Sequence, residues 1–238
     1  MAKEIENPPG QLSLPFWNKF LYSFGSVGIA ITNQVMMGFV FFFYAPTEGI
    51  KGAVPLVSPL VVSAIFFFGR FLDTFIDPGV AYYSDRCKSP RGRRMPFMLW
   101  GGLPLAASMA LLFFPPVHGM SAWNGVYIAF VLSTFYFMFS FYVCPYLGLL
   151  PELARTAGDR LNLTSAQGGF TLLGTAIASI AGAMLLGKTG YGGMALFMGA
   201  LALISFYAPV IGVDEKKYCI PAPVSELNIV DTIKSTLE

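Results

Sequence analysis

The chain has 238 residues, of which 55% are hydrophobic and 12% are charged, and its formal net charge at pH 7 is +2. A soluble domain usually carries about 25% charged residues, so this composition excludes an ordinary soluble globular protein. The near-neutral charge argues against a nucleic-acid partner. Three cysteines and one histidine match no disulfide framework or zinc pattern, so we expect no metal site and no cofactor.

Six apolar segments are long enough to cross a hydrocarbon layer about 30 Å thick, which takes about 20 helical residues. Backbone groups in lipid must pair within their own segment, so we expect helices. The first segment lacks the basic start of a signal peptide and is expected to remain in the protein. The predicted spans are 18–44, 57–83, 97–114, 126–150, 165–187 and 194–213.

The predicted fold is therefore an all-α membrane domain over residues 18–213. Residues 1–17 precede it and a polar segment, 214–238, follows it. Twelve lysines and arginines fall on the side of both termini, whereas Lys51 and Lys188 fall on the other side. Since positive charge accumulates in cytoplasmic loops, we expect both terminal segments to be cytoplasmic.

Three charged side chains interrupt the second span: Arg70, Asp73 and Asp77. Their spacing of three and four residues places them on one helical face. Each charge at mid-membrane costs about 2.5–3.5 kcal/mol on insertion scales, so this face is expected to line a protein interior or a wet cavity. Two carboxylates and one guanidinium leave a net negative charge, which suits a site for Na⁺ or H⁺. The alternative is an internal salt bridge that only holds helices together.

A charged stretch follows at 84–96, where Asp85 and Arg86 precede the pair Arg93 and Arg94. One interpretation is a topology signal. Another is a latch of charges that holds the helix ends together in one state of a gate. The two interpretations are compatible.

In the fifth span Gly174, Ala178 and Gly182 recur every four residues. Small residues at this spacing let helix backbones approach closely in membranes. We therefore expect a packing ridge for a neighbouring helix.

These motifs resemble those of the glycoside–pentoside–hexuronide:cation symporters, the melibiose permease family within the major facilitator superfamily. The matching patterns are Arg-x-x-Asp-x-x-x-Asp-Pro at 70–78, Ser-Asp-Arg at 84–86 and Gly-Arg-Arg-x-Pro at 92–96. The stretch 145–153, Pro-Tyr-Leu-Gly-Leu-Leu-Pro-Glu-Leu, is similar to the end of that family's fourth helix. The resemblance implies that the six helices form the N-terminal half of a major facilitator fold.

The resemblance also implies that Asp73 and Asp77 coordinate the coupling cation with help from Ser140. The sugar-binding half departs from the family pattern: Val143 and Gln167 stand where melibiose permease has an aspartate and an arginine. We expect the substrate cavity to include Arg70, Asn33, Tyr136 and Gln167. The expected gating or topology residues are Asp85, Arg86, Arg93, Arg94, Glu152 and Arg155.

The predicted function is symport of a sugar or related small solute, coupled to Na⁺ or H⁺, in the plasma (inner) membrane, and not enzymatic catalysis. The expected partners are the bilayer, the solute, and either a second six-helix half or another copy of the chain. The alternatives are a non-transporting membrane subunit, a truncated fragment, or a lysolipid-type carrier of the same family.

Overall fold

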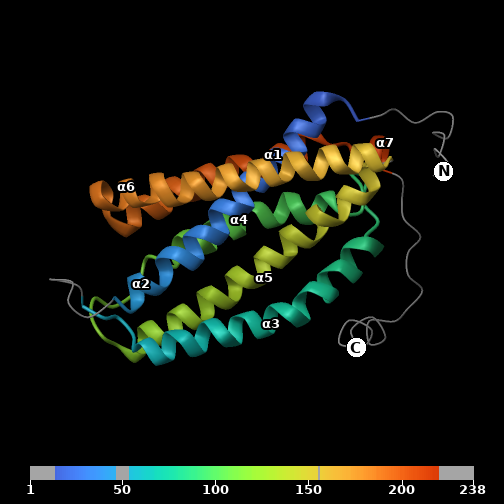
Figure 1. The fold of residues 1–238 in the computed structure, drawn as a ribbon. Helices are drawn as coiled ribbons and strands as arrows, with labels where there is room; N and C mark the ends of the chain where they lie inside the picture. Colours follow the sequence, from blue (N-terminus) through green and yellow to red (C-terminus); the bar gives the residue numbers. More distant parts are fainter. Residues whose placement is uncertain (1–13, 47–53, 155, 220–238) are drawn as a thin grey trace.

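The computed structural model describes residues 14–46, 54–154 and 156–219, and all regular structure in these ranges is helical (Figure 1). Most of the two terminal segments, together with Arg155, lies outside the described residues. The elements are α1 (Phe16–Val35), η1 (Met36–Val40), α2 (Phe41–Tyr44), α3 (Pro59–Arg86), α4 (Met95–Leu111), α5 (Ala122–Leu153), α6 (Ala157–Gly212) and α7 (Glu215–Tyr218).

Four helical stretches of the described chain are long and apolar enough to cross a membrane. The first joins α1, the π-helical turn η1 and α2 into 29 residues, and the others are α3, α5 and α6. Helix α4 is apolar but has only 17 residues. The predicted spans 18–44, 57–83, 97–114 and 126–150 each coincide with one of these helical stretches, with ends that differ by a few residues.

Helix α6 contains a break that corresponds to the predicted gap between the last two spans. It covers 56 residues, but Gly190 has φ 71° and ψ −176°, which is not a helical conformation. Glycine adopts a positive φ without the steric cost that a side chain would add. The two arms of α6 therefore coincide with the predicted spans 165–187 and 194–213.

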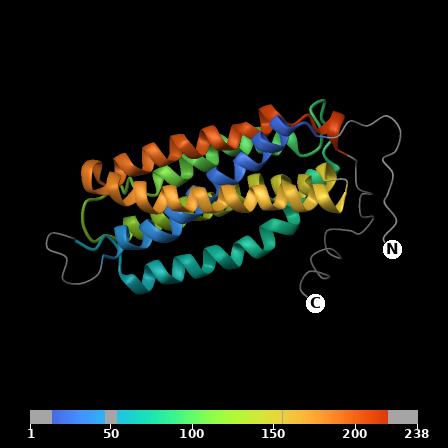
Figure 2. The same ribbon diagram turned by 45° about the horizontal axis from the view of Figure 1, so that its top comes forward.

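The helices pack as a bundle in which α1 lies along α6 and α4 contacts both α5 and α6. Helix α3 packs on α5 and forms one edge of the bundle (Figures 1 and 2). Its outer face is apolar and exposed, as expected for a surface that meets lipid or another protein body. The exposed side chains on α3 include Leu60, Val61, Phe67, Phe68, Phe71, Leu72, Phe75 and Tyr83.

The predicted small-residue ridge lies in the contact between α6 and α1. Gly174, Ala178 and Gly182 are all buried. A Cβ atom added at Gly174 would lie 2.6 Å from the carbonyl oxygen of Val27 and 3.0 Å from its Cα. Only glycine therefore fits there without moving one of the two backbones.

Candidate functional site

Two successive side-chain pairs join α3 to α5. The Ser140 hydroxyl donates to Oδ1 of Asp73 at 2.8 Å, and the Cys144 thiol donates to Oδ1 of Asp77 at 3.3 Å. Asp73 and Asp77 are four residues apart on α3, and Ser140 and Cys144 are four residues apart on α5. The two pairs therefore stack one helical turn above the other. We call this arrangement the paired-acid ladder; it consists of Asp73, Asp77, Ser140 and Cys144.

Arg70 borders the first pair of the ladder. Its Nη1 lies 3.5 Å from Oδ2 of Asp73, and its guanidinium carbon lies 5.2 Å from the centre of the Tyr136 ring. The Arg70 side chain is 43% exposed and that of Asp73 is 15% exposed. Tyr136 is buried against Gly69, at which an added Cβ atom would clash with the ring. Asp77 itself is exposed.

The ladder brings together the three residues predicted to bind the cation. Two carboxylates and one hydroxyl supply oxygen atoms, which are the ligands that hard cations prefer. Arg70 compensates one of the two negative charges, so the group keeps a net charge of −1 when both acids are ionised. Cys144 was missed because only its spacing of four residues from Ser140, equal to that between the two acids, pointed to it.

The other two residues predicted for the substrate cavity lie in different surroundings. Asn33 is exposed on α1. Gln167 on α6 is buried, and its Nε2 donates to the Tyr146 hydroxyl at 2.9 Å. That hydroxyl donates to the Tyr22 carbonyl at 2.9 Å, and the Tyr22 hydroxyl donates to the Tyr146 carbonyl at 2.7 Å. Gln167 is thus part of a buried network that joins α1, α5 and α6.

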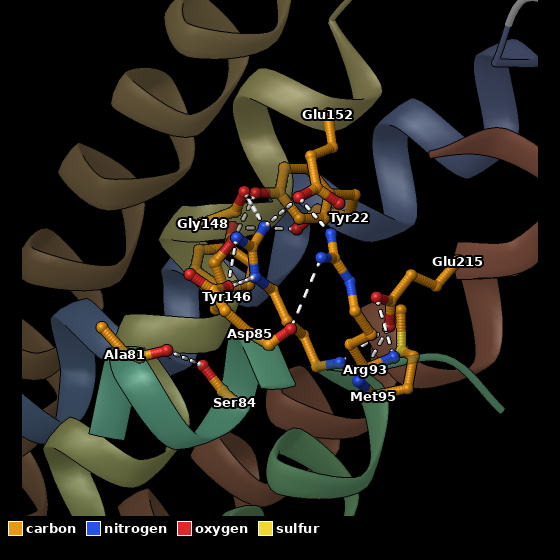
Figure 3. A network of polar contacts seen from close by, with 11 residues as sticks. Tyr22, Ala81, Ser84, Asp85, Arg93, Met95, Tyr146, Gly148, Glu152 and Glu215 are labelled. Atoms are coloured by element: carbon orange, nitrogen blue, oxygen red, sulfur yellow. Dashed lines mark hydrogen bonds and ion pairs between the residues drawn. The ribbon is translucent and has the colours of Figure 1, made fainter. Parts of the chain in front are cut away.

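At the end of the bundle that carries α7, an ion network joins α3, α4 and α5 (Figure 3). Nε and Nη2 of Arg94 donate to Oδ1 of Asp85 at 2.9 and 2.6 Å. Oε1 of Glu152, whose side chain is 3% exposed, lies 2.8 Å from Arg93 and 3.1 Å from Arg94. Arg94 also donates to the carbonyl of Gly148. Four of the predicted gating residues therefore meet in one place.

The other two predicted gating residues are Arg86 and Arg155. Arg86 stacks on Tyr82, with its guanidinium carbon 3.5 Å from the ring centre. Arg155 lies outside the described residues.

Glu215 completes this end of the molecule, and its role was not predicted. Its carboxylate accepts hydrogen bonds from the backbone N–H groups of Arg93 and Arg94, each at 2.9 Å, and of Met95 at 3.1 Å. These groups form the N-terminus of α4, where free N–H groups and the helix dipole favour a negative charge. No local pattern signals this contact, because Glu215 lies more than a hundred residues from α4.

The chain is similar to known membrane transport proteins. The family model described as MFS/sugar transport protein matches residues 21–237. The chain is 28% identical over 172 residues to an uncharacterized symporter of Synechocystis, which covers 70% of the chain and 30% of the relative. It is 23% identical to the isoprimeverose transporter of Lactiplantibacillus pentosus, over 85% of the chain and 43% of the relative.

A third relative, the inner membrane symporter YicJ of Escherichia coli, is 24% identical over 80% of the chain and 40% of its own length. The predicted resemblance to the glycoside–pentoside–hexuronide symporters is thereby confirmed. The chain spans less than half the length of these curated relatives.

Proposed function

Because this chain belongs to the MFS/sugar transport protein family, which comprises membrane transporters and not enzymes, we propose that it is one half of a cation-coupled sugar symporter. In this proposal its helices form six membrane spans: α1 with η1 and α2, then α3, α4, α5 and the two arms of α6. A second six-helix body completes the transport site. It is a further part of the same polypeptide, a separate chain or another copy of this chain. Major facilitator transporters bind their solute between two such bodies.

The paired-acid ladder is the observation that carries the proposal. It places two carboxylates and a hydroxyl on two packed, apolar helices, next to one arginine. Each charge within a membrane-spanning helix costs stability in lipid. Charged residues inside a span are therefore typical of ion pathways. The exposure of Asp77 and Arg70 leaves the ladder accessible from the face that a second body would cover.

The solute in this proposal is a sugar or a related polar molecule. Arg70 and Asn33, which are exposed, contact it directly. Tyr136 holds the Arg70 guanidinium in place through its ring, and Gln167 contributes indirectly, by its hydrogen bond to Tyr146. The name of one relative, the isoprimeverose transporter, supports the choice of a sugar.

We also place the orientation and the gate within this proposal. Both termini are cytoplasmic in a plasma (inner) membrane, so the ion network of Asp85, Arg93, Arg94 and Glu152 lies at the cytoplasmic end. Its ion pairs hold α3, α4 and α5 together in the state seen here. Opening of the transport path towards the cytoplasm would require them to separate.

The proposal is tested by uptake of labelled sugars into vesicles that contain the chain alone or with its second six-helix body. A Na⁺ or proton gradient supplies the driving force. Asp73→Asn and Asp77→Asn are each expected to abolish gradient-driven uptake while the amount of protein in the membrane stays normal. Asp214→Asn, outside the spans, is the matched control. Normal gradient-driven uptake in either variant would remove that acid from the coupling site.

A further inference from the structure

We propose that Cys144 determines the choice of coupling ion, and that its thiol favours protons over Na⁺. This inference rests on the proposed function, because it assigns a role within the same cation site. It starts from the difference between the two pairs of the ladder. Asp73 faces a hydroxyl, whereas Asp77 faces a thiol in the equivalent position one turn further along both helices.

A hydroxyl and a thiol offer different chemistry to a cation. The Ser140 oxygen can donate its hydrogen to a carboxylate and still direct a lone pair to a bound ion. A thiol is a weak donor and a weak acceptor, and its soft sulfur is a poor ligand for a hard ion. A Na⁺ ion held between the two pairs would therefore have an oxygen ligand from Ser140 but none from Cys144.

A proton makes no comparable demand on the site. A proton binds to one carboxylate oxygen and needs no shell of several ligands. A sulfur in place of an oxygen at position 144 therefore weakens proton binding less than it weakens Na⁺ binding.

The charges around the ladder agree with this assignment. Arg70 on α3 forms an ion pair with Asp73, and the Tyr136 ring on α5 lies against the Arg70 guanidinium. Arg70 contacts Asp73, whereas the hydrogen-bond partner of Asp77 is Cys144. Asp77 is thus the acid held by the thiol, and it is exposed on the face from which a proton can arrive.

The test compares sugar uptake driven by a Na⁺ gradient with uptake driven by a pH gradient in vesicles containing the complete carrier. Cys144→Ser replaces the sulfur by an oxygen and is expected to lower the Na⁺ concentration for half-maximal uptake by roughly tenfold. Cys144→Ala removes the group and is expected to give no such gain. Ser140→Cys makes the first pair a thiol pair too and is expected to raise the Na⁺ requirement further.

A second readout does not depend on transport. Na⁺ is expected to slow alkylation of Cys144 by N-ethylmaleimide only at high concentration, and in the Ser140→Cys variant it should take a still higher concentration to slow alkylation of the ladder thiols. Protection of Cys144 at low Na⁺ concentration would contradict weak Na⁺ binding beside the thiol. Cys87, which lies outside the ladder, serves as the control thiol and should react at the same rate with and without Na⁺.

Three results would overturn the inference. An unchanged Na⁺ requirement in Cys144→Ser would show that the thiol does not select the ion. An equal gain in Cys144→Ala would show that side-chain size matters and the oxygen does not. In both of these cases loss of gradient-driven uptake in Asp73→Asn would leave the proposed function standing. Normal gradient-driven uptake in Asp73→Asn would overturn the cation site and this inference together.

Discussion

At the scale of single residues, the Lys19–Asp159 ion pair ties the first turn of α1 to the first turn of α6, where Asp159 precedes the predicted span 165–187. The two charged atoms are 2.7 Å apart and both side chains are 30% exposed. The hydrogen bond from Lys19 lowers the pKa of Asp159 below its usual value. The pKa of Asp159 is lower in the folded state than in the unfolded state, where it is about 3.9. The ion pair therefore stabilises the folded protein fully above that unfolded pKa, and this stabilisation is lost as the pH falls through the folded pKa.

We therefore expect Asp159→Asn to lower the thermal-unfolding midpoint of the detergent-purified protein at pH 7 and to have no effect once the pH is below both pKa values. The partial exposure of the pair limits its contribution to less than about 1 kcal/mol, and salt should reduce it. Scanning calorimetry over a pH series measures the difference. A difference that persists at the lowest pH would show that the ion pair is not its cause.

The relative placement of the ladder's residues could be predicted where the spacing alone places side chains on one face. The positions of Asp73 and Asp77 one turn apart on α3 follow from the helical repeat. Their partners do not follow from it, because the register between α3 and α5 depends on packing between segments far apart in sequence. Ser140 came from the family resemblance, whereas Cys144 and Glu215 needed the structure.

At the scale of helices, the three hydrogen bonds to Glu215 make it a cap for α4 that comes from the far end of the chain. We expect Glu215→Gln to destabilise the protein by about 1 kcal/mol, because the neutral amide loses the charge that the helix N-terminus favours. Hydrogen exchange should quicken at the amides of Arg93, Arg94 and Met95. The exposed neighbour Lys216, changed to Met, is the control. Unaltered exchange at those amides in Glu215→Gln would rule out the cap.

The contact between α1 and α6 offers a second test at this scale. Gly174→Ala is expected to destabilise the bundle by about 1–3 kcal/mol, since its Cβ atom meets the Val27 backbone and the two helices must move apart. Gly168→Ala on the same helix is the matched control, because an added Cβ meets nothing within 4 Å there. The thermal midpoints of the two variants decide the matter. Equal midpoints would mean that the helices can separate at no cost.

At the scale of the whole molecule, apolar segments of about 20 residues predicted the helices and the order in which they follow. The observed helix ends differ from the predicted span ends because capping contacts set them. Helix α5, for example, begins at Ala122, where the Ser121 hydroxyl accepts from the N–H of Trp123. The packing order could not be predicted, since lipid-facing and protein-facing sides are equally apolar. The polar face of α3 and the small-residue ridge of α6 indicated in advance which side of each helix packs inward.

The orientation of the bundle is the last property that the charges predict. The turn between α3 and α4 carries four lysines and arginines, and Arg86 ends α3, so this turn should lie in the cytoplasm. His118, between α4 and α5, should lie outside. In a cysteine-free carrier, we expect a membrane-impermeant maleimide to label His118→Cys in intact cells. A variant that retains only Cys87 should be labelled in inside-out vesicles and not in intact cells. Labelling of both variants after detergent lysis controls for buried thiols. The opposite pattern would invert the topology, and the ion network of Arg93 and Arg94 would then close the outer end of the transport path.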